Sequence, residues 1–265
     1  MTSIHGKLDS NKTYKMNIQI EHLKKNFGEK TAVDIGSFKI ADGTMLGLVG
    51  NNGAGKTTLF RLLLDLIKRD AGTIAVSWKQ NDQENGDMQT GGVETVDPAE
   101  SEDWKLHTGA YIDDGFLIDF LMPEEYFDFL GRIYNLSSEE LQGRLEMFEH
   151  FMNGEVLGQK KLIRNLSAGN KQKVGIVGAL IGRPKLLILD EPFNFLDPSS
   201  QSQLKHLLTA YNEEEKATIL ISSHNLQHTV DICPRIALME HGIILKDLQN
   251  EGGSAEKELE DYFNV

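Results

Sequence analysis

The sequence MLGLVGNNGAGKTTL, which runs from Met45 to Leu59, decides the fold of this chain. Its first part, Met45 to Val49, is an apolar run with the length of a buried parallel strand. The next part, Gly50 to Thr57, matches the pattern G-x-x-x-x-G-K-T, and leucines recur at helical spacing from Leu59 onward. A strand, a glycine-rich turn and a helix in this order predict a loop that binds phosphate groups.

Each kind of residue in this loop has an expected role in holding a nucleoside triphosphate. Glycines let successive backbone N–H groups point at a polyphosphate without Cβ clashes, and the helix N-terminus adds partial positive charge. We expect Lys56 to reach the β- and γ-phosphates and the Thr57 hydroxyl to complete a Mg²⁺ shell. The residues expected to surround ATP are Gly50, Asn51, Asn52, Gly53, Ala54, Gly55, Lys56, Thr57 and Thr58. A turn that matches by chance is the alternative, and the preceding strand and the Lys-Thr pair argue against it.

The composition excludes several classes of protein. The 265 residues carry a formal net charge of −13, which disfavours binding to nucleic acid because such binding depends on clustered lysine and arginine. No apolar run approaches the ~18 residues of a membrane span, and the polar stretch before Met16 does not resemble a secretory signal. The one cysteine, Cys233, is expected to be a small buried side chain near a helix end. We expect a cytoplasmic protein.

The patterning predicts one domain over residues 16–265, after a polar extension over residues 1–15. Two amphipathic helices, Pro123 to Tyr134 and Ser138 to about Met152, predict a helical subdomain over about residues 116–166. Between Gln80 and Trp104 there are eight acids and no base. We expect this acidic insertion, over about residues 79–105, to be a solvated, mobile loop. It is either a tolerated surface insertion or an arm that binds a partner.

A second motif indicates the other half of a nucleotide site. The apolar run Leu186–Leu189 leads directly into Asp190 and Glu191. Such a strand delivers its last residues to the carboxyl edge of a parallel sheet, where ligands bind. Asp190 is expected to hold Mg²⁺, usually through water, and Glu191 to orient and deprotonate the attacking water. The motif is weak alone and strong together with Gly50–Thr57, and the two predict an ATPase.

With three further motifs in a fixed order, the sequence resembles the ATP-binding cassette (ABC) family from about Met16 to about Asn250. These motifs are Leu166-Ser-Ala-Gly-Asn170, Asn194-Phe-Leu-Asp197-Pro198 and Ser222-Ser-His224. The resemblance implies an α/β P-loop NTPase of ABC type. Its core sheet would be mostly parallel, with an antiparallel β subdomain and a helical subdomain.

The resemblance also implies roles for residues outside the phosphate loop. Phe27 lies where the family has an aromatic ring that stacks on adenine, with a buried core position as the alternative. Ser167 and Gly169 correspond to the signature that binds the γ-phosphate held by a second copy of the domain. Here the signature has Ala168 for glycine, which costs little at negative φ, and the shorter Asn170 for glutamine.

Two more residues correspond to catalytic or coupling positions of the family. Asp197 matches the acid that couples the two sites of a dimer, and it also fits a helix cap before Pro198. His224 matches the switch histidine, which contacts the γ-phosphate and Glu191. The resemblance therefore implies Glu191, His224 and Lys56 as the catalytic residues.

The clearest departure from the family lies at the end of the strand predicted over Leu106–Ile112. The family usually has glutamine there, touching Mg²⁺ and water, whereas Asp113 occupies this place, followed by Asp114. A carboxylate is a better ligand for a hard cation than an amide, so we expect Asp113 to bind Mg²⁺ directly. A pair of solvated turn acids is the alternative.

These motifs imply the ATP-binding and hydrolysing subunit of a membrane transporter. Two cassettes, expected to be two copies of this chain, close on two ATP and drive a separate permease. The contact with the permease is expected near Asp113 and Tyr126 to Tyr134. The short helical lobe is similar to that of bacterial exporters. The chain would then lie in the cytoplasm, peripheral to the membrane through the permease.

Two other functions are weighed against this one. A soluble ABC-type ATPase acting on ribosomes or nucleic acid would carry a second cassette or a coiled coil, and the acidity also disfavours it. A regulatory binder that does not hydrolyse ATP is disfavoured by the presence of Lys56, Asp190, Glu191 and His224. The transported substrate is not encoded here, because the permease selects it.

Overall fold

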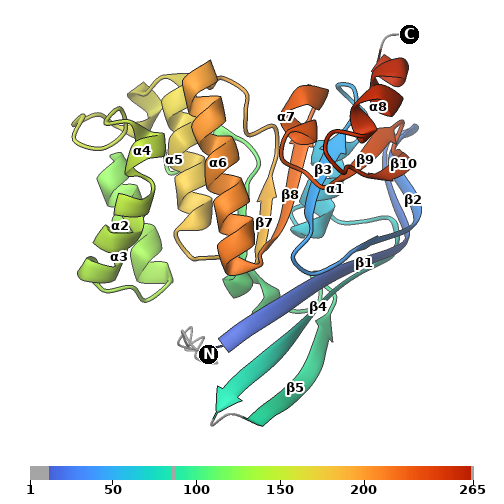
Figure 1. Ribbon diagram of the computed structural model, residues 1–265, viewed down its shortest axis with the longest axis horizontal. Helices are drawn as coiled ribbons and strands as arrows, with labels where there is room; N and C mark the ends of the chain where they lie inside the picture. The colour runs from blue at the N-terminus through green and yellow to red at the C-terminus, as the bar shows by residue number, and fades with distance from the viewer. Residues whose placement is uncertain (1–11, 85–86, 264–265) are drawn as a thin grey trace.

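The apolar run at the start of the phosphate loop forms strand β3 (Met45–Val49) in the middle of a six-stranded sheet (Figure 1). The computed structural model describes residues 12–84 and 87–263, with side chains over residues 16–78 and 93–259. Across the sheet the order is β10 (Ile243–Gln249), β9 (Arg235–Glu240), β3, β8 (Thr218–Ser223), β7 (Leu186–Leu189) and β6 (Thr108–Tyr111). All neighbours are parallel except β9 and β10, which form an antiparallel hairpin.

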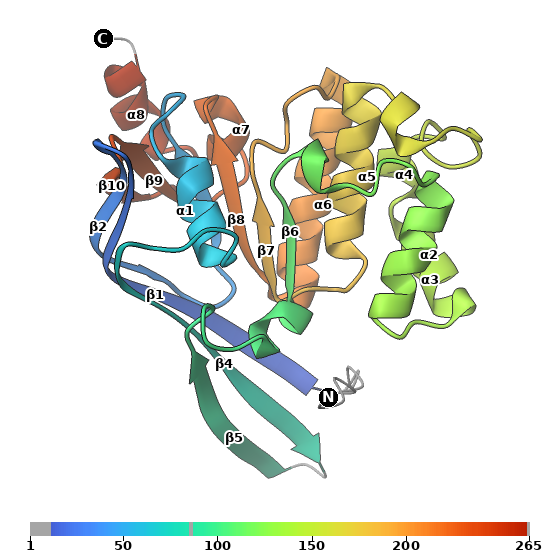
Figure 2. The same ribbon diagram turned by 180° about the vertical axis from the view of Figure 1, so that it is seen from behind.

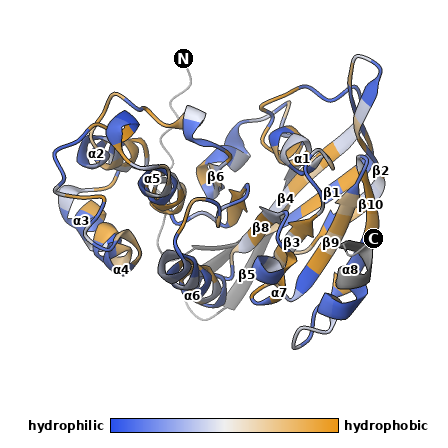
Figure 3. Ribbon diagram, turned by 90° about the horizontal axis from the view of Figure 1, so that it is seen from above, coloured by the Kyte–Doolittle hydropathy of each residue, from blue (hydrophilic) through white to orange (hydrophobic). Residues whose placement is uncertain are grey.

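Alternation along the central strand divides the core into two layers. Successive side chains of a strand point to opposite faces, so Leu46 and Leu48 are buried with one cluster and Met45 and Val49 with the other. The first cluster includes the apolar side of helix α1 (Lys56–Leu63). The second cluster includes the helices on the far face of the sheet. Figure 3 shows hydrophobic residues along these central strands.

A second, antiparallel sheet covers α1. Its order is β2 (Lys30–Ile40), β1 (Lys12–Phe27), β4 (Ala71–Glu84) and β5 (Asp87–Val96). Buried residues of β1 and β4, including Ile18 and Ile74, share a cluster with Leu59 and Phe60 of α1. The helix that follows the phosphate loop is therefore packed between the two sheets (Figure 2).

The remaining helices complete the molecule. Four lie beside the six-stranded sheet: α5 (Ala168–Leu180), α6 (Pro198–Glu215), α7 (Leu226–Val230) and α8 (Ala255–Phe263). Three form a helical lobe at the opposite end of the molecule from β1 and β2: α2 (Pro123–Ile133), α3 (Ser138–Met147) and α4 (Glu149–Met152) (Figure 1). In the described part of the chain, no helix is both long enough and apolar enough to span a bilayer.

The acidic insertion differs from its prediction. Instead of a mobile loop, most of it forms the hairpin of β4 and β5, in which Glu84 pairs with Asp87 and Asn81 with Thr90. Strand β1 extends the pairing, with Lys12 opposite Asp82. An antiparallel ladder is held by backbone hydrogen bonds, so a polar, acidic composition does not prevent it.

Other boundaries also shift. Helix α1 ends at Leu63, and α3 and α4 are two helices where one was predicted. The predicted extension over residues 1–15 falls mostly outside the described residues. Strand β1 begins at Lys12, before the predicted start of the domain at Met16.

Candidate nucleotide-binding site

The phosphate loop connects β3 to α1, and its glycines are required by the surrounding backbone. A Cβ atom on Gly50 would lie 2.1 Å from the carbonyl oxygen of Met239, and one on Gly55 would lie 2.3 Å from that of Ala32. Gly55 precedes α1 with φ of 111°, which disfavours other residues. The loop is therefore packed closely against the backbone of β2 and β9.

Lys56 is the first residue of α1, and its side chain is only 6% exposed. Its Nζ donates to the carbonyl oxygen of Gly50 at 2.6 Å and approaches that of Asn51 at 3.4 Å. The ammonium group thus lies folded over the loop, where it faces the space that the backbone encloses. This is the position expected of a lysine that contacts phosphate.

Thr57 and Asp190 lie together, as predicted for a metal site. The Thr57 hydroxyl donates to Oδ2 of Asp190 at 2.5 Å, and the Ser222 hydroxyl donates to Oδ1. Burial raises the pKa of Asp190 above its ordinary value, although both hydroxyl donors act in the opposite direction. A bound cation would favour the ionised form.

The donor set fits Mg²⁺, which prefers hard oxygen ligands and keeps several waters. Among the described residues, no group of three or more His, Cys, Asp or Glu side chains converges as a metal site. An ion held by Thr57 and Asp190 would therefore take its other ligands from phosphate and water.

Glu191 contacts both the phosphate loop and the end of β8. Its Oε1 lies 3.4 Å from Nζ of Lys56, and its Oε2 lies 2.8 Å from Nδ1 of His224. The backbone N–H of His224 also donates to Oε2, at 3.2 Å. The three residues predicted to be catalytic are therefore brought together.

Glu191 has a positive φ of 48°, which is unusual for a residue other than glycine. Two contacts hold this backbone in place. Its N–H donates to Oγ of Ser222 at 2.8 Å, and Nε2 of Gln172 donates to its carbonyl oxygen at 3.1 Å. In turn, the Tyr111 hydroxyl lies 3.2 Å from Oε1 of Gln172.

The supporting roles of Ser222 and Gln172 were missed in the sequence. Ser222 could have been found from strand alignment, because Leu189 of β7 pairs with Ile221 of β8, so the following residues, Asp190 and Ser222, are neighbours. Gln172 has no local signal, since its position depends on how α5 packs against β6 and β7.

A cavity of about 260 Å³ runs from Phe27 over the phosphate loop to Glu191. It is lined by Phe27, Lys30, Ala32, Asn52, Gly53, Ala54, Gly55, Lys56, Thr57, Thr58 and Glu191. Phe27 is 54% exposed, so the alternative of a buried core phenylalanine is wrong. Its ring, at the end of β1, lines the cavity, where it can stack on a planar base, and Nζ of Lys25 lies 5.4 Å from the ring centroid.

The signature residues line a different cavity, of about 340 Å³, which shares no residue with the first. Ser167 caps α5 and accepts a hydrogen bond from the backbone N–H of Asn170 at 3.2 Å. A Cβ atom on Gly169 would lie 2.7 Å from the carbonyl oxygen of Phe195. Ala168 lies in the first turn of α5 without a positive φ, so the replacement of glycine causes no strain.

Two residues of this second cavity are used inside the chain. Nδ2 of Asn170 donates to the carbonyl oxygen of Glu155 at 3.2 Å, so its amide points back into the chain. Asp197 caps α6, accepting from the N–H groups of Ser199 at 2.9 Å and Ser200 at 3.1 Å. Hydrogen bonds from Ser200 lower the pKa of Asp197. The capping role of Asp197 is confirmed, and the residue also lines the signature cavity.

Asp113, the third metal candidate, contacts helix α1 and its own turn. Its Oδ2 lies 3.1 Å from Nη2 of Arg61 on α1, and its Oδ1 accepts from the N–H of Gly115 at 2.9 Å. Asp114 faces another helix, with Oδ2 3.4 Å from Nζ of Lys171 on α5. Both acids thus take part in the turn that leads from β6 to the helical lobe.

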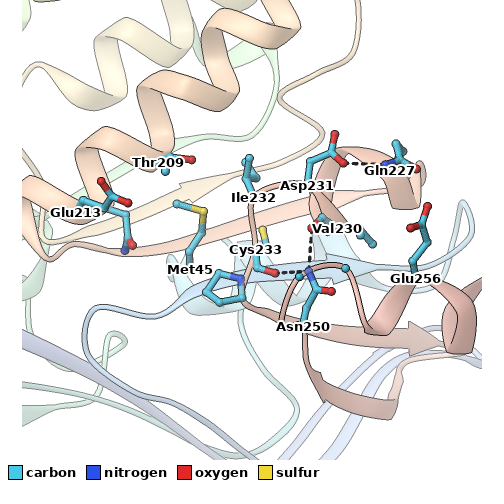
Figure 4. A pocket seen from close by; sticks show the side chains of 14 residues that line it. Met45, Thr209, Glu213, Gln227, Val230, Asp231, Ile232, Cys233, Asn250 and Glu256 are labelled. Atoms are coloured by element: carbon cyan, nitrogen blue, oxygen red, sulfur yellow. Dashed lines mark hydrogen bonds between the residues drawn. The ribbon is translucent and has the colours of Figure 1, made fainter.

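A larger cavity, of about 540 Å³, lies away from this chemistry, between α6, α7 and the segment that joins β10 to α8 (Figure 4). Asn250 closes one side, where its Nδ2 donates to the carbonyl oxygens of Val230 at 2.8 Å and Cys233 at 2.9 Å (Figure 4). Cys233 is buried as predicted, and this burial raises the pKa of its thiol. None of the predicted site residues lines this cavity.

The sequence is similar to those of known proteins. The ABC transporter family model matches residues 33–194, which is more than half of the chain. The bacitracin transport ATP-binding protein BcrA of Enterococcus faecalis is 31% identical over 235 residues, which cover 87% of this chain and 68% of that protein. The Nod factor export ATP-binding protein I of Paraburkholderia xenovorans strain LB400 is 30% identical over 226 residues, covering 85% of this chain and 68% of that protein.

A solved structure agrees with these relatives on the fold. The ATP-binding cassette MJ0796, a dimer bound to ADP and Pi, superposes with a TM-score of 0.72 at 20% identity, over 89% of this chain and 99% of that one. The chain spans between 54% and 76% of the length of its curated relatives. Together, the phosphate loop, the acids that follow β7, the family match and the relatives show that this chain belongs to the ABC transporter family and is one of its ATP-binding ATPases.

Proposed function

We propose that this chain is the ATP-hydrolysing subunit of a membrane exporter and that it works as a dimer on two ATP molecules. The observation that carries the proposal is the separation of two half-sites on one chain. The cavity at the phosphate loop and the cavity at the signature share no residue, so the signature of a chain does not line the nucleotide cavity of that same chain. Head-to-tail pairing of two copies would complete both sites at once.

In each composite site, one chain would hold ATP and its partner would cover the γ-phosphate. Phe27 would stack on adenine, the N–H groups of the loop and Lys56 would bind the phosphates, and Thr57 and Asp190 would hold Mg²⁺. The ion, when bound, neutralises charge on the phosphates. Ser167 and Gly169 of the partner copy present the N-terminus of α5 to the γ-phosphate.

Glu191 then acts as the general base. It accepts a proton from the water that attacks the γ-phosphate, and its contacts with His224 and Lys56 keep it oriented. His224 adds a contact to the γ-phosphate, and Asp197 contacts the partner across the dimer. In this proposal, Asp113 also binds Mg²⁺ directly.

The permease would dock on the helical lobe, on the side of α2 and the turn after β6. An apolar cavity of about 290 Å³ supports this position, lined among others by Leu66, Trp104, Phe116 and Tyr126. Phe116 and Leu66 are exposed hydrophobic residues there. An exposed apolar surface of this kind is typical of a protein interface.

Export is the proposed direction because relatives are named for Nod factor export and for linearmycin resistance. Association with the cytoplasmic face of a membrane would follow from the permease. A soluble ABC-type ATPase acting on ribosomes or nucleic acid is not favoured, because the relatives are transport proteins and the net charge is −13.

Mixing two inactive variants tests the composite sites. Lys56→Ala removes the phosphate contact of one half-site, and Gly169→Asp places a carboxylate where the other half-site faces an anion. Each variant alone should lack ATPase activity. The mixture should recover about a quarter of the wild-type rate, because half of the dimers then carry one intact site of two.

The matched control is a mixture of Lys56→Ala with the double variant Lys56→Ala/Gly169→Asp, in which no dimer has an intact site. Recovery confined to the first mixture supports the head-to-tail dimer. Absence of recovery, with both variants folded by circular dichroism, contradicts it.

A further inference from the structure

We infer that Arg61 competes with the bound metal ion for Asp113 and so acts as a positioning residue that sets the metal requirement of nucleotide binding. The inference rests on the proposed function, in which Thr57 and Asp190 hold Mg²⁺. Arg61 is not among the residues that the sequence predicts for the site. Asp113 is a metal candidate of that proposal, so its counter-ion bears on the metal requirement.

The first argument is the position of Arg61 relative to the metal site. Arg61 follows Thr57 by four residues in α1, so the two side chains lie on the same face of the helix, about 6 Å apart along its axis. Nη2 of Arg61 holds Oδ2 of Asp113 at 3.1 Å. Asp113 is thus held by a residue of α1 that lies one helical turn beyond Thr57.

The second argument is that this ion pair is easily exchanged. Arg61 contacts Asp113 through one nitrogen, and its Nε is buried without a hydrogen-bond partner in the described part of the chain. By contrast, Arg69 binds Asp97 through two nitrogens, at 2.7 Å and 2.5 Å. Bidentate pairs are the stronger kind.

Solvent weakens the Arg61 pair further. The two side chains are 40% and 44% exposed, and ion pairs at such positions contribute little. A divalent cation is a stronger partner for a carboxylate than a solvated guanidinium group. Asp113 can therefore leave Arg61 for the metal at a small cost in free energy.

The third argument concerns the neighbouring charges. Asp114, the other acid of the turn, lies 3.4 Å from Lys171 on α5, so it has a cationic partner of its own. The Asp113 carboxylate also accepts a hydrogen bond from the N–H of Gly115, which belongs to the same turn and therefore does not connect Asp113 to α1. Arg61 is therefore the contact that ties Asp113 to α1.

The test measures metal dependence without relying on turnover. ATP binding is followed with a fluorescent ATP analogue while Mg²⁺ is titrated, and Mn²⁺ is counted by electron paramagnetic resonance as a second readout. The Arg61→Gln variant should need about two- to fivefold less metal than the wild type, which is the range that an exposed ion pair allows. Asp113→Asn should need more metal, and Arg61→Gln/Asp113→Asn should behave like Asp113→Asn alone.

Two further variants serve as controls. Arg61→Lys keeps the charge and should leave the metal requirement close to that of the wild type, which separates the counter-ion effect from loss of packing. Arg132→Gln removes an exposed arginine that pairs with Asp128 on α2, and it should change nothing.

The inference is overturned if Arg61→Gln and the wild type have the same metal titration. It is also overturned if the shift persists in the Asp113→Asn background, because the effect would then be general electrostatics. If the wild-type chain does not bind ATP with any metal, the proposed function fails and the inference fails with it. A normal titration for the wild type with no effect of Arg61 rejects the inference alone.

Discussion

Oε2 of Glu191 lies 2.8 Å from Nδ1 of His224, while Oε1 of the same carboxylate lies 3.4 Å from Nζ of Lys56. One side chain therefore contacts both the phosphate loop and the residue that follows β8. The backbone of Glu191, with φ of 48°, is held by its hydrogen bonds with Ser222 and Gln172. The contacts with His224 and Lys56 make the Glu191 carboxylate the first group to test.

A Glu191→Gln variant should bind ATP with normal affinity but lose turnover by about 10²- to 10⁴-fold, because an amide cannot accept the proton of the attacking water. Phosphate release measures turnover, and size-exclusion chromatography with ATP should show accumulated dimer. Glu139→Gln, at an exposed position of α3, is the matched control. A monomer at saturating ATP would count against the dimer, and normal turnover would count against the base.

The Lys56→Ala variant should lose nucleotide affinity, because the ammonium group held over the loop by the Gly50 carbonyl supplies the positive charge nearest to the phosphates. Equilibrium binding of a fluorescent ATP analogue measures the loss. Lys68→Ala removes an exposed lysine just beyond α1 and should bind normally. Equal affinities in the two variants would remove the phosphate-loop assignment.

Phe27→Ala should weaken ATP binding roughly tenfold, within the range of base stacking on an aromatic ring. Phe27→Tyr should bind like the wild type, because stacking needs only the face of the ring. The comparison is made by isothermal titration calorimetry with ATP and with inorganic triphosphate. Triphosphate lacks the base, so a similar loss for both ligands would show that the ring does not stack on adenine.

A pH effect on stability is expected at the end of α6. Burial alone would raise the pKa of Glu215, but hydrogen bonds from Arg183 and Lys185 lower it below its ordinary value of 4.5. A lowered pKa stabilises the fold above the ordinary value, and this contribution is lost as the pH falls through the lowered value.

Glu215→Gln should therefore reduce the free energy of unfolding by about 1 to 3 kcal/mol at pH 7, and the difference should shrink as the pH falls below about 4. Chemical denaturation of the variant and the wild type, at pH 7 and at a pH below about 4, measures the difference in the free energy of unfolding. Glu214→Gln, one residue earlier and exposed, should have little effect at either pH. A loss for Glu215→Gln that is the same at both pH values would show that its charge is not involved.

Much of the fold was predictable because its signals are local. The apolar run Met45–Val49 and the glycines after it specify a strand and a turn by themselves. In the same way, the apolar run that ends at Leu189 predicts a strand with two acids at its carboxyl end. The hairpin of β4 and β5 was not predictable in this way. Strand β4 pairs with β1, which is distant in sequence, and β5 pairs with β4, whereas the acidic composition indicated only exposure.

The site shows the same division. Lys56, Asp190, Glu191 and His224 were found from motifs that lie at strand ends. The contact of Asp113 with Arg61 was not found, because it depends on how the turn after β6 approaches α1. A residue type predicts what a group can bind, whereas the packing of elements decides which partner it meets.

The burial of Cys233 has a practical consequence for following this protein in solution. The single thiol of the chain lies in the core with a raised pKa, so it has little thiolate at neutral pH and should react slowly with maleimides. A cysteine introduced at exposed Glu139 on α3 would then carry a spectroscopic label selectively, with the native core residue left in place. Movements of the helical lobe could be recorded as distances between the labels of two copies.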